Sequence, residues 1–403
     1  MKIVERGFIP VLFASDINTY SMARAFHEAY GVKSIVMGKA ATGPSANSRI
    51  VDFVLDPKID QDEEFLARLN GFARDHANKK IIAVGCGDAY AALLSRHKGE
   101  YEPNVIAAYI DYDQMQELIK KENFYKMCEK YGLDYPDTFI YRKEYGHDFT
   151  LPFDGPFIAK PSDSVMYWEF PFAGQKKVYK LDTRAELEKA LDDIYASGYS
   201  DSVIIQNFIP GNDSYMHVLT CYSDQNGKVK LMSLGHVLLE EHTPHGLGNH
   251  AVILNEVNLD LMRKMKKFLE EIHYVGFSNF DIKYDERDGK YKVFEINLRQ
   301  GRSNFYVTGS GFNLARCLVE EYVEHKESKL TVADKPHLWL VIPRRVAYRY
   351  IHNDKAVAEM KEVIRRYGYV NPLFYKGDLG PARLKFVLRN YISHIFKYRK
   401  YCK

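Results

Sequence analysis

Two apolar segments near residue 290 carry carboxylate and amide side chains at alternating positions. The first segment contains Asp281, and the second contains Glu295 and Asn297, with Ile296 between them. Side chains two positions apart in a β-strand point to the same face, so Glu295 and Asn297 are expected to share a face. Two carboxylates and an amide oxygen form an oxygen-only donor set that suits Mg²⁺. A surface hairpin with alternating polar residues explains the same spacing equally well.

Two basic residues near these segments could hold phosphate groups. Arg299 continues the face of Glu295 and Asn297, where it would lie beside a metal and could bind a γ-phosphate. Lys160 ends an apolar strand pattern and precedes Pro161, which restricts the backbone before it. A lysine fixed in this way is a point charge suited to phosphate. Taken alone, a strand-end lysine in solvent is the simpler explanation.

The segment 204–213 could contribute to a nucleotide site. It begins as an apolar strand and runs into Pro210-Gly211, with Asp213 two residues further on. Backbone groups at the end of this strand could bind a base, and the Asp213 carboxylate could bind a ribose. Taken alone, a plain strand that ends in a turn is the simpler explanation.

The elements that would position these residues follow two patterns. Up to about residue 96, apolar runs at 9–14, 33–37 and 81–84 alternate with helical patterns, and Asn18 or Thr19 is expected to cap the first helix. This alternation predicts a parallel sheet covered by helices, with ligands at the carboxyl ends of its strands. Further strands are expected at 157–160, 177–181, 203–208, 217–222, 228–239, 250–254, 277–284 and 292–297, and helices at 258–273 and after a capping box at 183–186.

Composition and charge limit the class of protein. Apolar residues make up 46% of the chain and charged residues 27%, which is typical of a globular protein. The sequence contains no run of 18 apolar residues, so no membrane span is expected. The five cysteines form no CxxC pair, which favours free thiols in a reducing cytoplasm over a zinc site. Residues 341–403 contain 15 Lys or Arg and 4 Asp or Glu, on an otherwise acidic chain. This asymmetry suggests an anionic partner, either a phosphate-bearing substrate or a membrane surface.

In their order along the chain, the three motifs resemble those of the ATP-grasp ligase superfamily. The resemblance covers about residues 8–325, and its most specific element is the pair of segments 279–283 and 294–299. It implies an α/β (α+β) ATP-grasp fold in three parts. These parts are a Rossmann-like pre-ATP-grasp domain at 1–115, an ATP-grasp domain at 116–330 with a small β-rich lid subdomain at about 155–210, and a basic helical C-terminal extension at 331–403.

The resemblance also implies ATP and two Mg²⁺ ions as cofactors. The residues that match the family's ligand-binding positions are the metal ligands Asp281, Glu295 and Asn297, the phosphate-binding Lys121 and Lys160, the adenine hinge Gln206, Asn207, Phe208 and Ile209, and the ribose acid Asp213. The residues that match catalytic positions near the γ-phosphate and the acyl phosphate are Arg299 and Arg302, together with Lys160.

Two features depart from the family pattern. The family often has an acid where this chain has Gln206, a change that backbone contacts to adenine would survive. The family's phosphate lid is usually rich in glycine, whereas the corresponding stretch 162–174 has a single glycine. This lid is expected to close with backbone amides and with Ser162 or Ser164.

Within the superfamily, the chain resembles the bacterial D-aspartate ligase type of carboxylate–amine ligase. The resemblance lies in the segments 8–24, 43–48, 209–214 and 297–306. It implies that the β-carboxylate of D-aspartate is activated as an acyl phosphate and joined to the lysine side-chain amine of a peptidoglycan precursor. Such an enzyme is expected in the cytoplasm, in cell wall biogenesis, without nucleic acid as a partner. A ligase for another amino acid, or for dipeptide synthesis, remains an alternative.

Two other classes of protein fit less well. An NAD-dependent oxidoreductase would need Gly-x-Gly-x-x-Gly after a strand, and Gly85-Cys86-Gly87 is followed by Tyr90 at the third glycine position. A non-catalytic nucleotide-binding protein would be expected to lose a metal ligand or a phosphate-binding lysine, and none is missing.

The basic tail contains an apolar helical stripe among its Lys and Arg residues. Two arrangements are expected for it: a peripheral contact with a membrane, or a helix packed on the rest of the protein with its basic face in water. The stripe consists of Leu384, Val387, Leu388, Tyr391, Ile392, Ile395 and Phe396.

Overall fold

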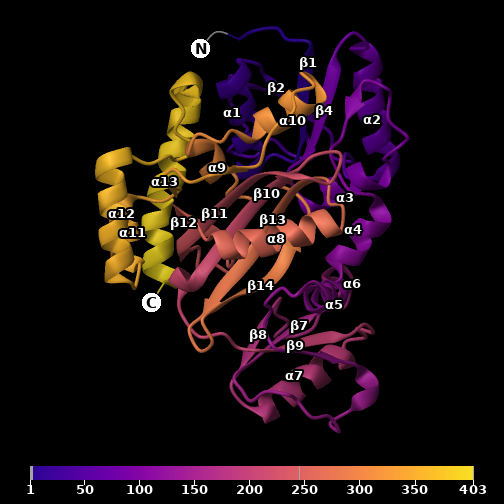
Figure 1. The fold of residues 1–403 in the computed structure, drawn as a ribbon, viewed down its shortest axis with the longest axis vertical. Helices are drawn as coiled ribbons and strands as arrows, with labels where there is room; N and C mark the ends of the chain where they lie inside the picture. The colour runs from indigo at the N-terminus through magenta and orange to yellow at the C-terminus, as the bar shows by residue number, and fades with distance from the viewer. Residues whose placement is uncertain (1–2, 245, 403) are drawn as a thin grey trace. The chain divides into compact units, whose positions relative to one another are not determined.

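The computed structural model describes residues 3–244 and 246–402, without the side chains of residues 164 and 165. The chain forms two compact units (Figure 1). The larger unit contains residues 1–115, 212–280 and 297–403, and the smaller unit contains residues 116–211 and 281–296. The division between them runs through two neighbouring strands, β13 (Gly276–Asp285) and β14 (Lys290–Asn297). The three-part division expected from the sequence stays a prediction.

A five-stranded sheet begins the larger unit. Its order is β3-β2-β1-β4-β5 and all its pairs are parallel, as the alternating pattern predicts. Asp16 caps the first helix, because its side chain accepts hydrogen bonds from the amides of Asn18 and Thr19, the two residues predicted as caps. The strands are β1 (Phe8–Phe13), β2 (Ser34–Gly38), β3 (Val51–Leu55), β4 (Lys80–Gly85) and β5 (Val105–Ile106), and the connected helices are α1 (Ile17–Tyr30), α2 (Asp62–Asp75), α3 (Asp88–Arg96) and α4 (Tyr112–Ile119).

A seven-stranded, mostly antiparallel sheet follows. Its order is β14-β13-β10-β11-β12-β16, and β15 pairs with β11 in parallel. Helix α8 buries a stripe that includes Leu261, Met265 and Phe268, as its 3.6-residue pattern predicts. The remaining strands are β10 (Met216–Ser223), β11 (Val229–Glu240), β12 (His250–Glu256), β15 (Thr331–Val332) and β16 (Leu338–Leu340), and the helices are η2 (Asp213–Tyr215), α8 (Leu259–Glu271), α9 (Phe305–Gly309) and α10 (Leu314–Tyr322).

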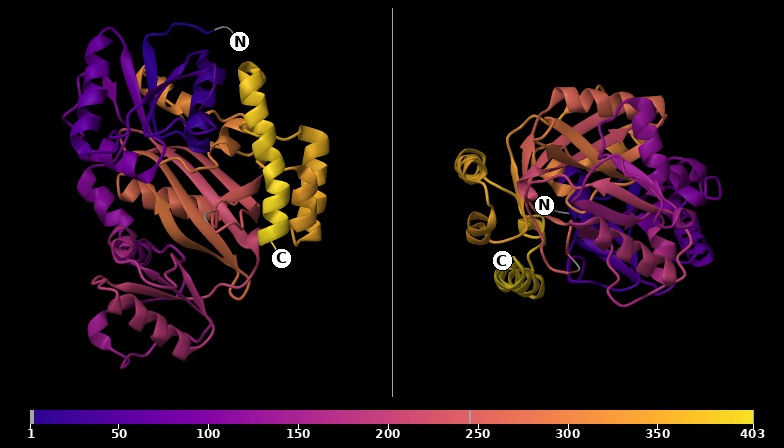
Figure 2. Two further views of the ribbon diagram at one scale, coloured as in Figure 1. Left: turned by 180° about the vertical axis from the view of Figure 1, so that it is seen from behind. Right: turned by 90° about the horizontal axis from the view of Figure 1, so that it is seen from below.

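Helices α11 (Arg344–Tyr350), α12 (Asp354–Tyr367) and α13 (Pro381–Tyr401), with the short η3 (Lys376–Asp378), complete the larger unit. Figure 2 shows the three long helices together, in orange and yellow. The guanidinium of Arg383 lies 3.0 Å from the carboxylate of Asp378, and both side chains are fully buried. The hydroxyl of Tyr398 donates a hydrogen bond to the carbonyl of Glu240 at 2.5 Å. Helix α13 is therefore held by polar contacts at both ends.

The smaller unit is built on a four-stranded antiparallel sheet in the order β6-β9-β7-β8. Helix α7 begins with the predicted capping box, in which Thr183 and Glu186 satisfy each other's backbone amides. Its core is rich in tyrosine, including Tyr141, Tyr167 and Tyr199. The strands are β6 (Thr138–Tyr141), β7 (Phe157–Pro161), β8 (Tyr179–Leu181) and β9 (Val203–Asn207), and the helices are α5 (Lys121–Tyr131), η1 (Lys143–Tyr145), α6 (Ser164–Glu169) and α7 (Arg184–Ala196).

Within residues 3–244 and 246–402, no helix is long and apolar enough to cross a membrane.

Candidate active site

Lys160 lies in β7 of the smaller unit, and only 8% of it is exposed. Its Nζ donates a hydrogen bond to Oη of Tyr125 at 2.9 Å, and Tyr125 donates to the carbonyl of Phe294 at 2.7 Å. Burial lowers the pKa of Lys160 to about 8, although the Glu295 carboxylate opposes this effect. The chain thus holds a buried ammonium group in a fixed position between α5 and β14.

Two further lysines act electrostatically on the same region. Burial lowers the pKa of Lys121, the first residue of α5; Glu295 raises this pKa, whereas Lys160 and Lys177 lower it. Ammonium groups that repel one another are stabilised by an anion with several charges, such as a triphosphate. Lys177 was not identified from the sequence, where its only signal is its position just before a strand.

The predicted hinge follows β9. The buried side-chain amide of Gln206 donates to Oγ1 of Thr138 at 2.8 Å. The backbone amides of Asn207 and Phe208 both donate to carbonyl groups of neighbouring loops at 3.0 Å. Among the described residues, the amide of Ile209 meets no hydrogen-bond acceptor. The Ile209 N–H is therefore the hinge donor that a base could use.

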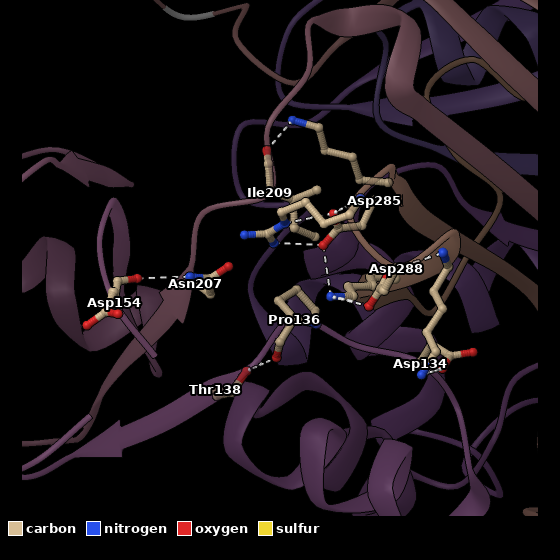
Figure 3. Close-up of polar contacts among 12 residues, drawn as sticks. Asp134, Pro136, Thr138, Asp154, Asn207, Ile209, Asp285 and Asp288 are labelled. Carbon is tan, nitrogen blue, oxygen red and sulfur yellow. Dashed lines mark hydrogen bonds and ion pairs between the residues drawn. The ribbon is translucent and has the colours of Figure 1, made fainter. Parts of the chain in front are cut away.

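The hairpin between β13 and β14 supports the hinge (Figure 3). Nζ of Lys283 donates to the carbonyl of Ile209 at 2.9 Å. At the end of the same strand, the fully buried Asp285 accepts hydrogen bonds from Arg287 at 2.7 Å and from Lys292 at 2.8 Å. These two cations hold the pKa of Asp285 well below its usual range. The hairpin is thus rigidly closed by ion pairs, which fixes the strands that carry Asp281 and Glu295.

The stretch predicted as the phosphate lid contains a short helix, α6, at Ser164–Glu169. Ser162 is buried just before this helix, and its amide donates to the carbonyl of Ser202 at 3.0 Å. The carboxylate of Asp163 accepts a hydrogen bond from the amide of Met166 at 3.0 Å. The structure therefore has a helical turn where the family has a glycine-rich loop, and the role of Ser162 stays a prediction.

Asp281 and Glu295 come from neighbouring strands, β13 and β14, of the same sheet. Both side chains are half-buried. Burial alternates over the last three residues of β14: Glu295 and Asn297 are half-buried, and Ile296 between them is 7% exposed. Two half-buried carboxylates on adjacent strands, without a soft ligand, fit a hard cation such as Mg²⁺.

Asn297 and Arg299 belong to the larger unit. Nδ2 of Asn297 donates to the carbonyl of Asn279 at 3.3 Å, which orients its side-chain amide. Nε of Arg299 lies 2.7 Å from the Asp88 carboxylate. The next residue, Gln300, is fully buried and donates to the carbonyl of Gly85 at 3.3 Å. The loop after β14 is therefore held at the carboxyl end of β4, where a parallel sheet is expected to bind ligands.

Arg302 lies beside the loop that follows β11. Its Nη2 is 3.1 Å from the carboxylate of Glu241. Burial and, secondly, the charge of Arg302 lower the pKa of His250 to about 4. Nη1 of Arg302 is buried without a hydrogen-bond partner within the described part of the chain. An unpaired buried N–H costs free energy, so this group fits an anionic oxygen of a ligand.

Asp213 also belongs to the larger unit. Its Oδ2 lies 2.7 Å from Nε2 of His242 and accepts a hydrogen bond from the amide of Glu240 at 2.9 Å. The hydrogen bond to Asp213 raises the pKa of His242. Asp213 thus fixes the start of the loop after β11.

The predicted site residues divide between the two units, and their roles stay predictions. Nine lie in the smaller unit: Lys121, Lys160, Ser162, Gln206, Asn207, Phe208, Ile209, Asp281 and Glu295. Four lie in the larger unit: Asp213, Asn297, Arg299 and Arg302. Tyr125, which supports Lys160, and Glu241, which pairs with Arg302, could not be identified from the sequence, because no local pattern marks them.

The chain resembles a known protein along 98% of its length. The chain is 42% identical over 414 residues to a D-aspartate ligase of Enterococcus faecium (strain Aus0004), and the match covers 98% of both chains. No family model matches the chain.

Solved structures share its fold. One is an L-amino acid ligase from Bacillus licheniformis, with a TM-score of 0.55 and 15% identity over 79% of this chain and 74% of that chain. Another is an N5-carboxyaminoimidazole synthetase from Staphylococcus aureus complexed with ADP, with a TM-score of 0.58 and 14% identity over 84% of this chain and 83% of that chain. These likenesses confirm the expected ATP-grasp fold.

Proposed function

The chain belongs to the D-aspartate ligase family of ATP-grasp enzymes, and from this premise we propose its substrates. It is an ATP-dependent ligase that joins a carboxylate to an amine. The carboxylate is the β-carboxyl group of D-aspartate, and the amine is the lysine side chain of a peptidoglycan precursor. One observation carries this proposal: 42% identity along 98% of both chains to a relative that is named for D-aspartate.

The reaction has two steps. An oxygen of the β-carboxylate attacks the γ-phosphorus of ATP, the bond from that phosphorus to the bridging oxygen breaks, and ADP leaves an acyl phosphate behind. The amine then attacks the acyl carbon, the bond to the phosphate oxygen breaks, and phosphate leaves as the nitrogen loses a proton. Water must be excluded between the two steps, because it would hydrolyse the acyl phosphate.

Asp281, Glu295 and Asn297 would hold the metal, with two Mg²⁺ ions as the proposed number. Bound there, the ions supply positive charge that offsets the phosphate oxygens during transfer. The chain's own electrostatics support this assignment. Carboxylates repel a bare triphosphate, whereas Glu295 lies where Lys121 and Lys160 attract one. A nucleotide with its metal satisfies both sets of charges.

Lys121 and Lys160 bind the nucleotide phosphates in this proposal. With a pKa of about 8, Lys160 is protonated in most molecules at neutral pH, and a bound phosphate favours that form further. Because Tyr125 already holds its ammonium group, little reorganisation is needed when phosphate binds. Lys177 joins them on the basis of its electrostatic effect on both lysines.

The hinge residues Gln206, Asn207, Phe208 and Ile209 hold the adenine, and Asp213 binds the ribose. The Ile209 amide supports this role because its N–H is the one left unused at the hinge. Ser162 contacts the phosphates at the start of the lid, where α6 takes the place of a glycine-rich loop.

Arg299 and Arg302 stabilise the γ-phosphate and the acyl phosphate. The buried, unpartnered Nη1 of Arg302 supports contact with an anionic oxygen, either of the phosphoryl group or of the amino acid's α-carboxylate. Each guanidinium group also pairs with one carboxylate, Arg299 with Asp88 and Arg302 with Glu241.

A ligase for another amino acid, or one that makes a dipeptide, is the second candidate. The observation that favours it is the structural likeness to an L-amino acid ligase at 15% identity, which concerns the fold alone. We place the enzyme in the cytoplasm, where ATP is available. A membrane contact of the basic tail does not follow from ligase activity and requires evidence from α13 itself.

The substrate is tested by measuring ADP release and product mass together. The purified chain is incubated with MgATP and either D- or L-aspartate, with and without a lysine-containing precursor. We expect ADP release to require D-aspartate. The product should contain one aspartate joined to the precursor with loss of water. Equal release with L-aspartate, or with a different amino acid alone, would favour the second candidate.

A further inference from the structure

Helix α13 exposes an apolar row instead of burying it. The buried face of the helix includes Arg383, Val387, His394 and Tyr398. Four large apolar side chains in line on a solvent-facing surface differ from the single apolar residues that are normal there. We call them the apolar row: Leu384, Leu388, Ile392 and Phe396, which are 39%, 42%, 49% and 63% exposed.

The same helix carries only positive charge. Between Pro381 and Tyr401 there is no Asp or Glu. At 3.6 residues per turn, the exposed basic side chains fall on the same half of the helix as the apolar row. These basic residues are Lys385, Arg389, Arg399 and Lys400.

A groove of about 430 Å³ lies between α11 and α13. Ile395 of α13 lines it, one residue from the apolar row, so the groove and the row adjoin. Its lining contains no acidic residue, and in the described part of the chain none of its arginines forms an ion pair. The arginines that line it are Arg344, Arg345, Arg349 and Arg399.

We propose that this α11–α13 face docks the enzyme on a membrane surface that contains anionic phospholipid. The groove arginines bind headgroup phosphates, and the apolar row enters the boundary between headgroups and acyl chains. A bilayer with anionic headgroups offers both chemistries side by side. A soluble phosphate would satisfy the arginines and leave the row in water, and an apolar protein surface would leave the arginines without counter-charges.

Sedimentation with vesicles tests this proposal on the full-length chain. The vesicles are phosphatidylcholine with or without phosphatidylglycerol. One variant reverses groove charges, Arg345→Glu with Arg349→Glu, and a second removes apolar surface, Leu388→Ser with Ile392→Ser. The matched controls make the same changes at exposed positions around α8: Arg263→Glu with Lys267→Glu, and Val257→Ser with Leu259→Ser.

Each basic residue near an anionic surface changes partitioning roughly fivefold. We therefore expect phosphatidylglycerol to raise wild-type binding at least about tenfold and each α11–α13 variant to lose at least about tenfold of it. The control variants should bind within about twofold of wild type, and ADP release by every variant in solution should match wild type.

Three results would overturn the proposal. The first is wild-type binding that does not depend on phosphatidylglycerol. The second is loss of binding in the α8 controls equal to that in the α11–α13 variants, which would show that net charge alone decides. The third is binding of glycerol phosphate to the wild-type groove without any binding of the chain to vesicles, which would show a site for soluble phosphate. The proposal is independent of the ligase substrate, since none of these readouts requires turnover.

Discussion

Glu295 is the carboxylate that acts on the pKa of two lysines of the smaller unit. It raises the pKa of both Lys121 and Lys160, while burial lowers both. Without it, this carboxylate would no longer oppose the repulsion among the three lysines, and the proposed metal site would lose an oxygen ligand. Its replacement should therefore affect catalysis far more than folding.

Glu295→Gln should lower the rate of ADP release at least about a hundredfold, because the amide keeps the shape of the side chain and removes the charge that a metal needs. Steady-state release with D-aspartate measures this effect, and circular dichroism checks the fold. Glu286→Gln, in the exposed loop of the same hairpin, is the matched control and should retain full activity. Full activity of Glu295→Gln would remove Glu295 from the site.

Lys160 should give ATP binding a dependence on pH. Its pKa of about 8 means that its charge is present below pH 8 and disappears as pH rises through 8. The apparent Kd for ATP should therefore increase above about pH 8 in wild type. In Lys160→Arg, whose side chain stays charged at these pH values, the increase should be absent. An identical pH profile in both proteins would show that Lys160 does not contact phosphate.

The same group affects stability with a definite sign. The folded-state pKa of Lys160 lies below the unfolded value of 10.5, so burial of the charged form opposes folding below pH 8. This cost decreases as pH rises from about 8 to 10.5. The ATP and stability effects of Lys160 therefore have opposite directions over the same range of pH.

At the residue scale, the alternation of apolar and polar residues predicted which side chains of a strand share a face. The half-buried positions of Glu295 and Asn297 around Ile296 follow from the period of a strand. The support for Lys160 by Tyr125 could not be predicted, because it joins segments 35 residues apart through a fold that the local sequence does not specify.

At the scale of elements, α13 shows where periodicity stops being informative. The seven-residue apolar stripe is divided: Val387 is buried, whereas Leu388 and Phe396 are exposed. The inward face is decided by distant partners, since Arg383 pairs with Asp378 and Tyr398 bonds to Glu240. The helix packs on the larger unit, as one of the two expected arrangements requires, yet it turns apolar as well as basic side chains to solvent.

Asp378 should be a major anchor of this extension. Its buried carboxylate accepts hydrogen bonds from Tyr20 at 2.8 Å and Ser48 at 2.7 Å, besides its pairing with Arg383. Asp378→Ala would leave the Arg383 charge buried without its counter-ion, so we expect a loss of about 3–5 kcal/mol in the free energy of unfolding, measured in urea. Asp354→Ala, at the exposed start of α12, should cost about 1 kcal/mol or less. Similar losses in both variants would contradict a special role for Asp378.

The caps and short strands show the limits of prediction for other elements. The capping box of α7 was predicted because Thr-x-x-Glu is local. The cap of α1 was misplaced onto Asn18 or Thr19, because Asp16 just before them has the side chain that reaches their amides. Strand β16, with three residues, is too short for a periodic signal, and its pairing with β12 depends on the fold.

At the scale of the whole molecule, each unit collects segments that are distant in sequence. Residues 281–296 join the smaller unit, whereas the three strands just before β13, β10 to β12, belong to the larger one. The order of the motifs and the resemblance predicted the ATP-grasp fold. The two compact units could not be predicted from the sequence, because each combines segments that are far apart along the chain. The candidate site residues are likewise distributed over both units.

MgATP at about a hundredfold above its Kd should raise the free energy of unfolding by about 2.7 kcal/mol. Thermal unfolding with and without MgATP measures this as an upward shift of the melting temperature. Glu286→Gln should keep the shift and Glu295→Gln should lose most of it. The same shift in both variants, or with ATP in the presence of a chelator, would indicate nucleotide binding that does not use these carboxylates.

Anomalous diffraction can show whether Asp281, Glu295 and Asn297 hold the metal of a bound nucleotide. Crystals grown with Mn²⁺ and a non-hydrolysable ATP analogue locate the metal without relying on activity. We expect anomalous peaks within bonding distance of oxygens of all three side chains. A nucleotide bound with its metal peaks away from these three residues would contradict it.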